Sequence, residues 1–173
     1  MPEVNLSENG DLGLPGDPPK GKAPKKGKKG GKGKKGKGGV DKTFEGFGFD
    51  DNATENGGFR FIPPDPIGAA GKSRVVAVVN TIIESRTKGG ALKWRDSLSD
   101  FFAPLAPTTF TFDPKIVYDQ YEDRFVVVTL EVVFGAASID PGNVSRLLLA
   151  VSKDGKPESP TAADWHYQAI ASK

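Results

Sequence analysis

The sequence predicts an all-β protein with two consecutive four-stranded β-propeller blades after a disordered Lys/Gly-rich tail. The main observation is an internal repeat. Segment 65–80, DPIGAAGKSRVVAVVN, matches segment 113–130, DPKIVYDQYEDRFVVVTL, in its opening Asp-Pro, its turn and its Arg before a Val-rich run. The two Asp residues, Asp65 and Asp113, are 48 positions apart, and Arg74 and Arg124 are 50 apart. A period near 50 is typical of propellers and solenoids.

Residues 1–40 hold ten Lys against four acidic residues, and Lys20–Gly39 is almost wholly Lys and Gly. Such a segment has no apolar surface to bury, so we expect it to be disordered. It is either a soluble spacer or an electrostatic tether to a polyanion, such as a nucleic acid, an acidic cell-wall polymer or lipid headgroups. No aromatic residue is interleaved with these lysines, which argues against base stacking and a nucleic-acid partner.

Residues 41–62 form a lead-in rich in Phe, Gly and acids. Clustered carboxylate and amide oxygens followed by two Gly residues are typical calcium ligands, although the spacing is not that of an EF-hand loop. The alternative is an ordinary polar turn between two Phe-bearing segments. The candidate ligands are Asp50, Asp51, Asn52, Glu55 and Asn56.

Residues 63–110 form the first repeat. Three prolines in Pro63–Pro66 end the lead-in, because they cannot donate to a sheet ladder. After the opening segment we expect strands at Val75–Val79, Asn80–Thr87 and Ala91–Asp96, with a hairpin turn at Lys88–Gly90. The connection Ser97–Phe110 carries Phe101 and Phe102, whose rings we expect to pack on the sheet.

Residues 111–173 form the second repeat. Phe125–Val128 and Leu147–Val151 are unbroken apolar runs, as expected for strands buried on both faces. Double burial requires a neighbouring sheet on each side, which stacked propeller blades supply. A Greek-key sandwich is the alternative, but it needs the alternation that only residues 165–168 show. The predicted strands are Lys115–Tyr118, Arg124–Phe134, Arg146–Ser152 and Trp165–Ile170, with turns at Gln120–Asp123, Asp140–Asn143 and Lys153–Thr161.

Residues 59–170 resemble the opening blades of large secreted bacterial β-propeller proteins in the segments PPDPIGAAGKSRVVAVVN, FDPKIVYDQYEDRFVVVTLE and RLLLAVSKDGKPESPTAADWHYQAI. The last segment is also similar to the Asp box of sialidase-like propellers, Ser-x-Asp-x-Gly-x-Thr-Trp. Ser152, Asp154 and Trp165 match that box in type. Gly155 comes one residue early, however, and nine residues separate it from Trp165.

This resemblance implies an extracellular or cell-surface propeller that acts as a binding or scaffold module for a surface or carbohydrate ligand. Part of a sialidase-like glycoside hydrolase is one alternative, and polyanion binding through the tail is another. The Asp box is a structural turn, so it transfers no catalytic residue.

Few residues suggest catalysis. The absence of Cys excludes thiolate chemistry, and the single histidine, His166, is expected at the surface. Asp65 and Asp113 occupy equivalent positions, where a propeller rim would place two carboxylates near a ligand. The alternative is that Asp-Pro is turn chemistry repeated in each unit. No cofactor is expected apart from the calcium considered above.

Two blades do not close a propeller ring, which typically has four to eight. Val126, Val128, Leu147 and Leu149 would then have one apolar side open to water. Residues 1–40 contain no apolar segment of a signal peptide, and no run in the chain is apolar enough to span a membrane. We therefore expect the chain to be part of a longer protein whose further blades are its partners, with a start that is also truncated.

Overall fold

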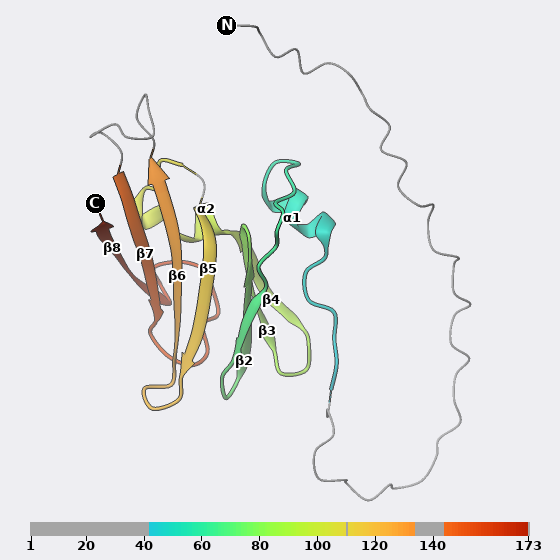
Figure 1. The fold of residues 1–173 in the computed structure, drawn as a ribbon. Coiled ribbons are helices and arrows are strands. Elements are labelled where there is room, and N and C mark those ends of the chain that lie inside the picture. The colour runs from blue at the N-terminus through green and yellow to red at the C-terminus, as the bar shows by residue number, and fades with distance from the viewer. Residues whose placement is uncertain (1–41, 110, 134–143, 173) are drawn as a thin grey trace, which may run out of the picture. The chain divides into compact units, whose positions relative to one another are not determined.

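The computed structural model describes residues 42–109, 111–133 and 144–172, which belong to one compact unit, Val40–Lys173. These residues are mostly β, with two four-stranded antiparallel sheets (Figure 1). The two predicted sets of four strands are therefore confirmed. The predicted disordered tail and the predicted turn at Asp140–Asn143 lie outside the described residues.

Both sheets are simple meanders in which each strand pairs with the next along the chain. The first sheet consists of β1 (Ile67–Ala70), β2 (Arg74–Val79), β3 (Ile82–Thr87) and β4 (Leu92–Ser97). The second consists of β5 (Thr111–Asp119), β6 (Arg124–Val133), β7 (Val144–Ser152) and β8 (Trp165–Ser172). Most of the predicted strands differ from the observed ones by only a few residues at each end.

The repeat seen in the sequence is also a repeat in strand register. In the first sheet Ala69 pairs with Val76 and Ile67 with Val78. In the second, Val117 pairs with Val126 and Lys115 with Val128. The same equivalence continues across all four strands. It aligns the row Ala69–Val76–Ser85–Trp94 with Val117–Val126–Val151–His166, and the row Ile67–Val78–Ile83–Asp96 with Lys115–Val128–Leu149–Gln168.

One hydrophobic core is shared by the two sheets. The first sheet contributes Val76, Val78 and Ile83, and the second contributes Phe125 and Val127. Between the sheets the chain forms α2 (Leu98–Phe101) and the 3-10 helix η1 (Ala103–Leu105).

Aromatic rings from this connection complete the core. Phe101 and Phe102 are fully buried, as the sequence predicted for the connection. The Phe101 ring stacks on Trp94 and meets Trp165 edge-to-face, with centroids 6.1 and 5.0 Å apart respectively. These contacts link both sheets to the connection, so the two repeats fold as one unit.

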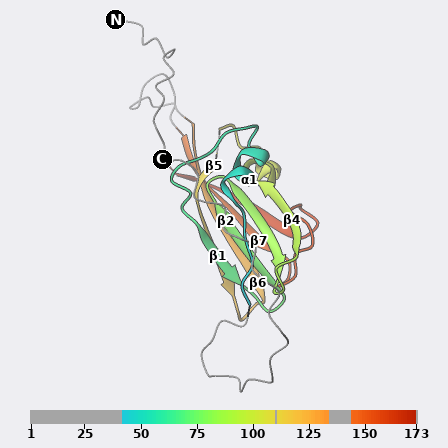
Figure 2. The same ribbon diagram turned by 90° about the vertical axis from the view of Figure 1, so that its right-hand side faces the viewer.

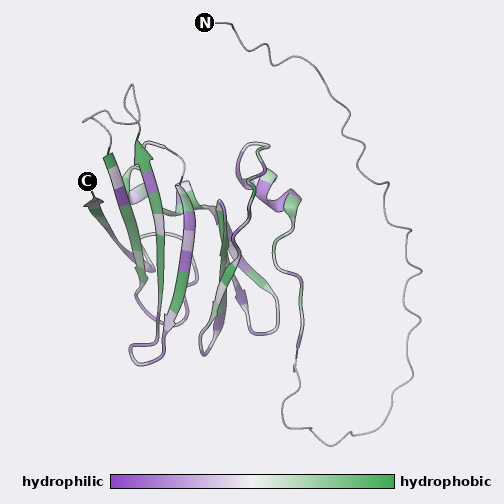
Figure 3. Cartoon of the chain, in the orientation of Figure 1, coloured by the Kyte–Doolittle hydropathy of each residue, from purple (hydrophilic) through white to green (hydrophobic). Residues whose placement is uncertain are grey.

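Among the described residues the middle strands of the second sheet are buried on one face only, as expected for a chain with two repeats, and not on both faces as in a closed ring. Along β6, Phe125 and Val127 are buried, whereas Val126 and Val128 are only half-buried. In β7, Leu148 and Ala150 are buried and their neighbours half-buried. The reason is that the first sheet covers one face and no described residue packs on the other. Figure 3 shows that β6 and β7 are hydrophobic over much of their length.

The lead-in forms a third layer, on the face of the first sheet that points away from the second (Figures 1 and 2). It contains the short helix α1 (Phe49–Glu55), which the sequence did not predict. The N–H of Gly48 donates to the Asp51 carboxylate over 2.5 Å. Asp50 and Asp51, in the first turn, also stabilise the helix through their interaction with the positive end of its dipole. No helix among the described residues is long and apolar enough to cross a membrane.

Candidate functional site

Asp65 and Asp113, the two aspartates predicted at the rim, both form a hydrogen bond with the side chain of Asn80. Its side-chain N–H donates to the Asp65 carboxylate and to the Pro63 carbonyl, each over 3.0 Å. Its side-chain oxygen accepts the backbone N–H of Asp113 over 2.8 Å. Asn80 directly follows β2, and its hydrogen bonds hold the starts of both repeats together.

Asp65 and Asp113 also share an unusual backbone conformation. Their φ angles are 43° and 50°, in the left-handed region that Asp adopts more readily than most residues. Asp113 lies where the pairing of β5 with β6 shifts register, which is typical of a β-bulge. Both residues therefore share the backbone geometry of a turn, and the Asp65 carboxylate accepts from Asn80 and not from its own backbone.

Four of the five candidate calcium ligands of the lead-in, Asp50, Asp51, Asn52 and Asn56, have a protein partner. Asp50 forms an ion pair with Arg60, and Asp51 forms one with Arg95. The buried Asn52 donates to the Asn80 carbonyl over 2.5 Å. Asn56 accepts from the Thr81 hydroxyl over 2.6 Å. Among the described residues, no group of three or more His, Cys, Asp or Glu side chains is arranged to hold a metal ion.

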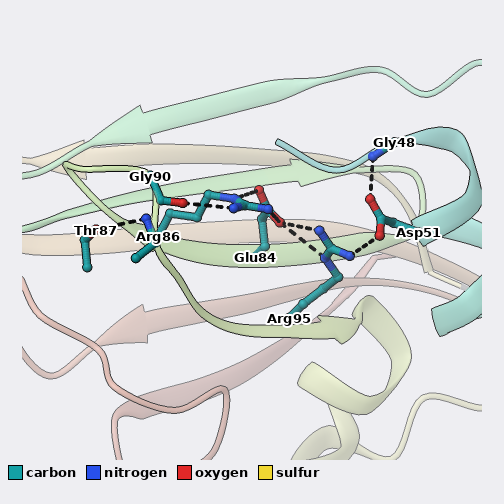
Figure 4. Close-up of polar contacts among 8 residues, drawn as sticks. Gly48, Asp51, Glu84, Arg86, Thr87, Gly90 and Arg95 are labelled. Carbon is teal, nitrogen blue, oxygen red and sulfur yellow. Dashed lines mark hydrogen bonds and ion pairs between the residues drawn. The ribbon is translucent and has the colours of Figure 1, made fainter. Parts of the chain in front are cut away.

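A buried carboxylate, Glu84, lies at the centre of a polar network on the face under the lead-in (Figure 4). Arg86 donates to it twice, over 2.6 and 3.0 Å, and Arg95 donates over 2.9 and 3.2 Å. Arg95 also contacts Asp51 of α1. Burial disfavours the Arg95 charge, but hydrogen bonds and attraction from Glu84 and Asp51 outweigh it and raise the Arg95 pKa. The network attaches the lead-in to the first sheet.

A second buried carboxylate, Glu131, has a similar role in the second sheet. It accepts the backbone N–H groups of Thr108 and Thr109 over 2.5 and 3.1 Å and pairs with Arg146. Burial opposes its charge, but these donors together lower the Glu131 pKa. A charged residue within an apolar strand, as in Ile82–Ile83–Glu84 or Leu130–Glu131–Val132, was the available signal for both networks.

The residues of the Asp-box-like segment form the turn between β7 and β8. The Ser152 hydroxyl accepts the Phe125 N–H and donates to the Asp154 carbonyl, over 2.8 and 2.6 Å. The Asp154 carboxylate accepts the Lys156 N–H over 2.7 Å. Trp165 is buried, and its indole N–H donates to the Ser159 carbonyl. These contacts are those of a structural turn, with Trp165 as part of the core.

The same turn reaches across to the first sheet. Trp94 donates from its indole N–H to the Pro157 carbonyl over 3.1 Å. The buried side chain of Arg74 pairs with Glu158 over 2.6 Å. Lys156 and Arg74 lower the Glu158 pKa to about 2.

A cleft of about 570 Å³ lies between β1 and β5, the first strands of the two sheets. On the β1 side it is lined by small residues, and on the β5 side by aliphatic and aromatic ones. Tyr121, at the β5–β6 turn, is 88% exposed. The lining residues are Gly68, Ala69, Ala70, Ile116, Val117, Tyr118, Asp119, Gln120 and Tyr121.

Polar groups of the cleft come mainly from the backbone. Among the described strands, β1 pairs only with β2 and β5 only with β6, so each has an edge to which no other described strand is paired. The Asp119 carboxylate accepts hydrogen bonds from the backbone N–H groups of Tyr121 and Glu122, over 2.8 and 3.2 Å. Tyr118 donates its hydroxyl to Asp123, which raises the Tyr118 pKa. No sequence pattern indicated this cleft, because it depends on how the sheets pack.

His166 lies on β8 and is exposed, as expected. It is on the opposite face of β8 from the buried Trp165, away from the shared core. Its neighbour Trp165 faces the first sheet, where its ring meets that of Trp94, while the His166 side chain faces solvent. The geometry therefore gives His166 no catalytic partner among the residues considered above.

Comparison of the chain with protein-family models, with curated protein sequences and with solved structures finds no match.

Proposed function

We propose that the two sheets are neighbouring blades of a β-propeller and that the protein is a binding or scaffold module outside a bacterial cell, with a carbohydrate ligand. The observation that carries the proposal is the shared strand register of two meander sheets that pack face to face with their first strands side by side. In propellers the first strand of each blade borders the central channel, where ligands usually bind.

The cleft between β1 and β5 is the site that we assign to this ligand. A sugar ring offers hydroxyl donors and acceptors as well as an apolar face. Backbone groups along the two sheet edges match the hydroxyls, and the exposed ring of Tyr121 matches the apolar face. Asp119 is the one charged residue among those that line the cleft, and its carboxylate is already hydrogen-bonded, which favours a neutral saccharide.

A glycan array followed by calorimetry tests this proposal. We expect binding of a neutral glycan, with affinity at least tenfold lower for Tyr121→Ala, which removes the ring, and for Ala70→Leu, which fills the cleft. Phe59→Ala is the matched control, because Phe59 is 71% exposed and belongs to the lead-in. Absence of any glycan binding, or equal binding by all variants, would refute the proposed ligand.

A panel of aryl-glycosides separates a binding module from a glycoside hydrolase. We expect no turnover. Turnover that is abolished by Asp65→Asn or Asp113→Asn would contradict the proposal and favour an enzyme with carboxylates at the rim.

A further inference from the structure

One face of the second sheet is apolar and uncovered by any described residue. Its residues lie on the opposite side of the strands from the shared core, so we call it the outer face. Val117 and Ile170 are 59% and 48% exposed there, and the other apolar members are half-buried. The outer face consists of Val117, Val126, Val128, Leu130, Leu147, Leu149, Val151 and Ile170, with Lys115, His166 and Gln168 at its edges.

The register shows what this face corresponds to in the first sheet. Val126 and Val128 are equivalent to Val76 and Val78. Val76 and Val78 are fully buried in the shared core, on the face of the first sheet that the second sheet covers. The outer face of the second sheet is thus the counterpart of a face already buried by a sheet.

The opposite end of the stack is built differently. Val127 and Ala150, which pack against the first sheet, have Ala77 and Glu84 as their equivalents. On the face that the lead-in covers, the first sheet therefore carries the charged Glu84 network and not an apolar surface. This face is closed by a polar cap, as terminal units of repeat arrays commonly are. The stack has one capped end and one open end.

We propose that the outer face docks a further four-stranded sheet of the same repeat type, through a face equivalent to the one that the second sheet turns toward the first. This inference rests on the propeller interpretation proposed above. A second copy of the described unit does not offer such a face. Its own Phe125 and Val127 are buried against its first sheet, and its other end is capped by the lead-in. The apolar centre and polar edges of the outer face suit a sheet-on-sheet contact.

The test is to lengthen the chain by a third repeat, with residues 98–172 repeated after Ser172 so that the connection with α2 and η1 is included. We expect the original chain to bind a hydrophobic dye, and the lengthened chain to lose most of that binding and to melt in one transition. We expect its Tm to be higher by roughly 5 °C or more.

Matched substitutions locate the contact. Val126→Lys with Val128→Lys, made in the original outer-face positions, should abolish the gain in the lengthened chain and change the Tm of the original chain by less than about 2 °C. Val76→Lys with Val78→Lys should unfold both chains, which shows that the method detects loss of a buried face.

Three results would overturn the proposal. The first is a lengthened chain that melts in two independent transitions and keeps its dye binding. The second is a stabilisation that the Val126 and Val128 substitutions leave intact. The third is an original chain that sediments as a dimer through the outer face, which would make a second copy the occupant. Glycan binding is measured separately, so the proposed ligand and this docking surface can fail independently.

Discussion

Arg74 and Glu158 form an ion pair over 2.6 Å that joins the first sheet to the β7–β8 turn of the second. Lys156 and Arg74 hold the Glu158 pKa at about 2, below its ordinary value. A lowered pKa means that the carboxylate stabilises the fold at pH above its unfolded value, and that this contribution is lost as pH falls toward 2.

We therefore predict that Glu158→Gln lowers the Tm at pH 7 and that the difference from wild type shrinks between pH 4.5 and pH 2. Thermal melts across this range measure it. Glu122→Gln, in the exposed β5–β6 turn, is the control and should behave as wild type. A difference in Tm between Glu158→Gln and wild type that does not change with pH would show that the ionised carboxylate is not what stabilises the fold.

Asp96 should destabilise the fold at neutral pH. Burial, together with the nearby charges of Asp100 and Glu55, raises its pKa to about 6. The folded state therefore favours the protonated form, and stability falls as pH rises from about 4 through 6. We predict that Asp96→Asn is more stable than wild type at pH 7.5 and equal to it near pH 4, with a difference of only about 1 kcal/mol because solvent screens this half-buried carboxyl. Urea denaturation at both pH values checks this, and lower stability of Asp96→Asn at pH 7.5 would refute it.

Gly71 lies where the β1–β2 turn contacts the second sheet. A Cβ atom at this position would lie 2.8 Å from both the Phe125 and the Tyr118 rings. Gly71→Ala should therefore reduce the free energy of unfolding by about 1–3 kcal/mol. Gly68→Ala is the matched control, because its nearest contact is at 3.6 Å and its φ is not positive. Equal stability of the two variants would mean that the sheets are farther apart here.

Among the polar interactions described above, the Glu84 network should contribute most to the free energy of unfolding. Glu84→Gln leaves the guanidinium groups of Arg86 and Arg95 without their shared carboxylate, so we predict a loss of about 3 kcal/mol in urea denaturation. Faster hydrogen exchange at residues 49–55 should accompany it, because Arg95 holds α1. Asp50→Asn removes an ion pair whose carboxylate is 92% exposed and should cost less than about 0.5 kcal/mol. Unchanged exchange in α1 would show that the network does not hold the lead-in.

The strands could be predicted because their signals are local. Val-rich and Leu-rich runs between Gly, Pro and Asp residues marked most strand positions to within a few residues, and the repeated Asp-Pro and Arg positions indicated that the two halves share one register. The packing of Phe101 and Phe102 followed from their position in a short connection between two sheets.

The features that the sequence did not show depend on contacts distant along the chain. Helix α1 has only seven residues and is held by Arg95 and Asn80 from the first sheet, so its own residues look like a polar turn. The junction at Asn80 and the cleft beside Tyr121 arise only when two repeats pack together. The unbroken apolar run of β6 indicated that both of its faces are apolar, but only the packing shows which face the first sheet covers.

The two sheets are stacked so that equivalent faces are buried in the first sheet and open in the second. Methyl NOE spectroscopy of the protein distinguishes this packing from the alternatives. We expect NOEs from the methyl groups of Val76 and Val78 to residues of the second sheet, and none from Val126 and Val128 to the first sheet. NOEs from Val126 or Val128 to the first sheet would show that the second sheet packs through its other face and would refute this stacking.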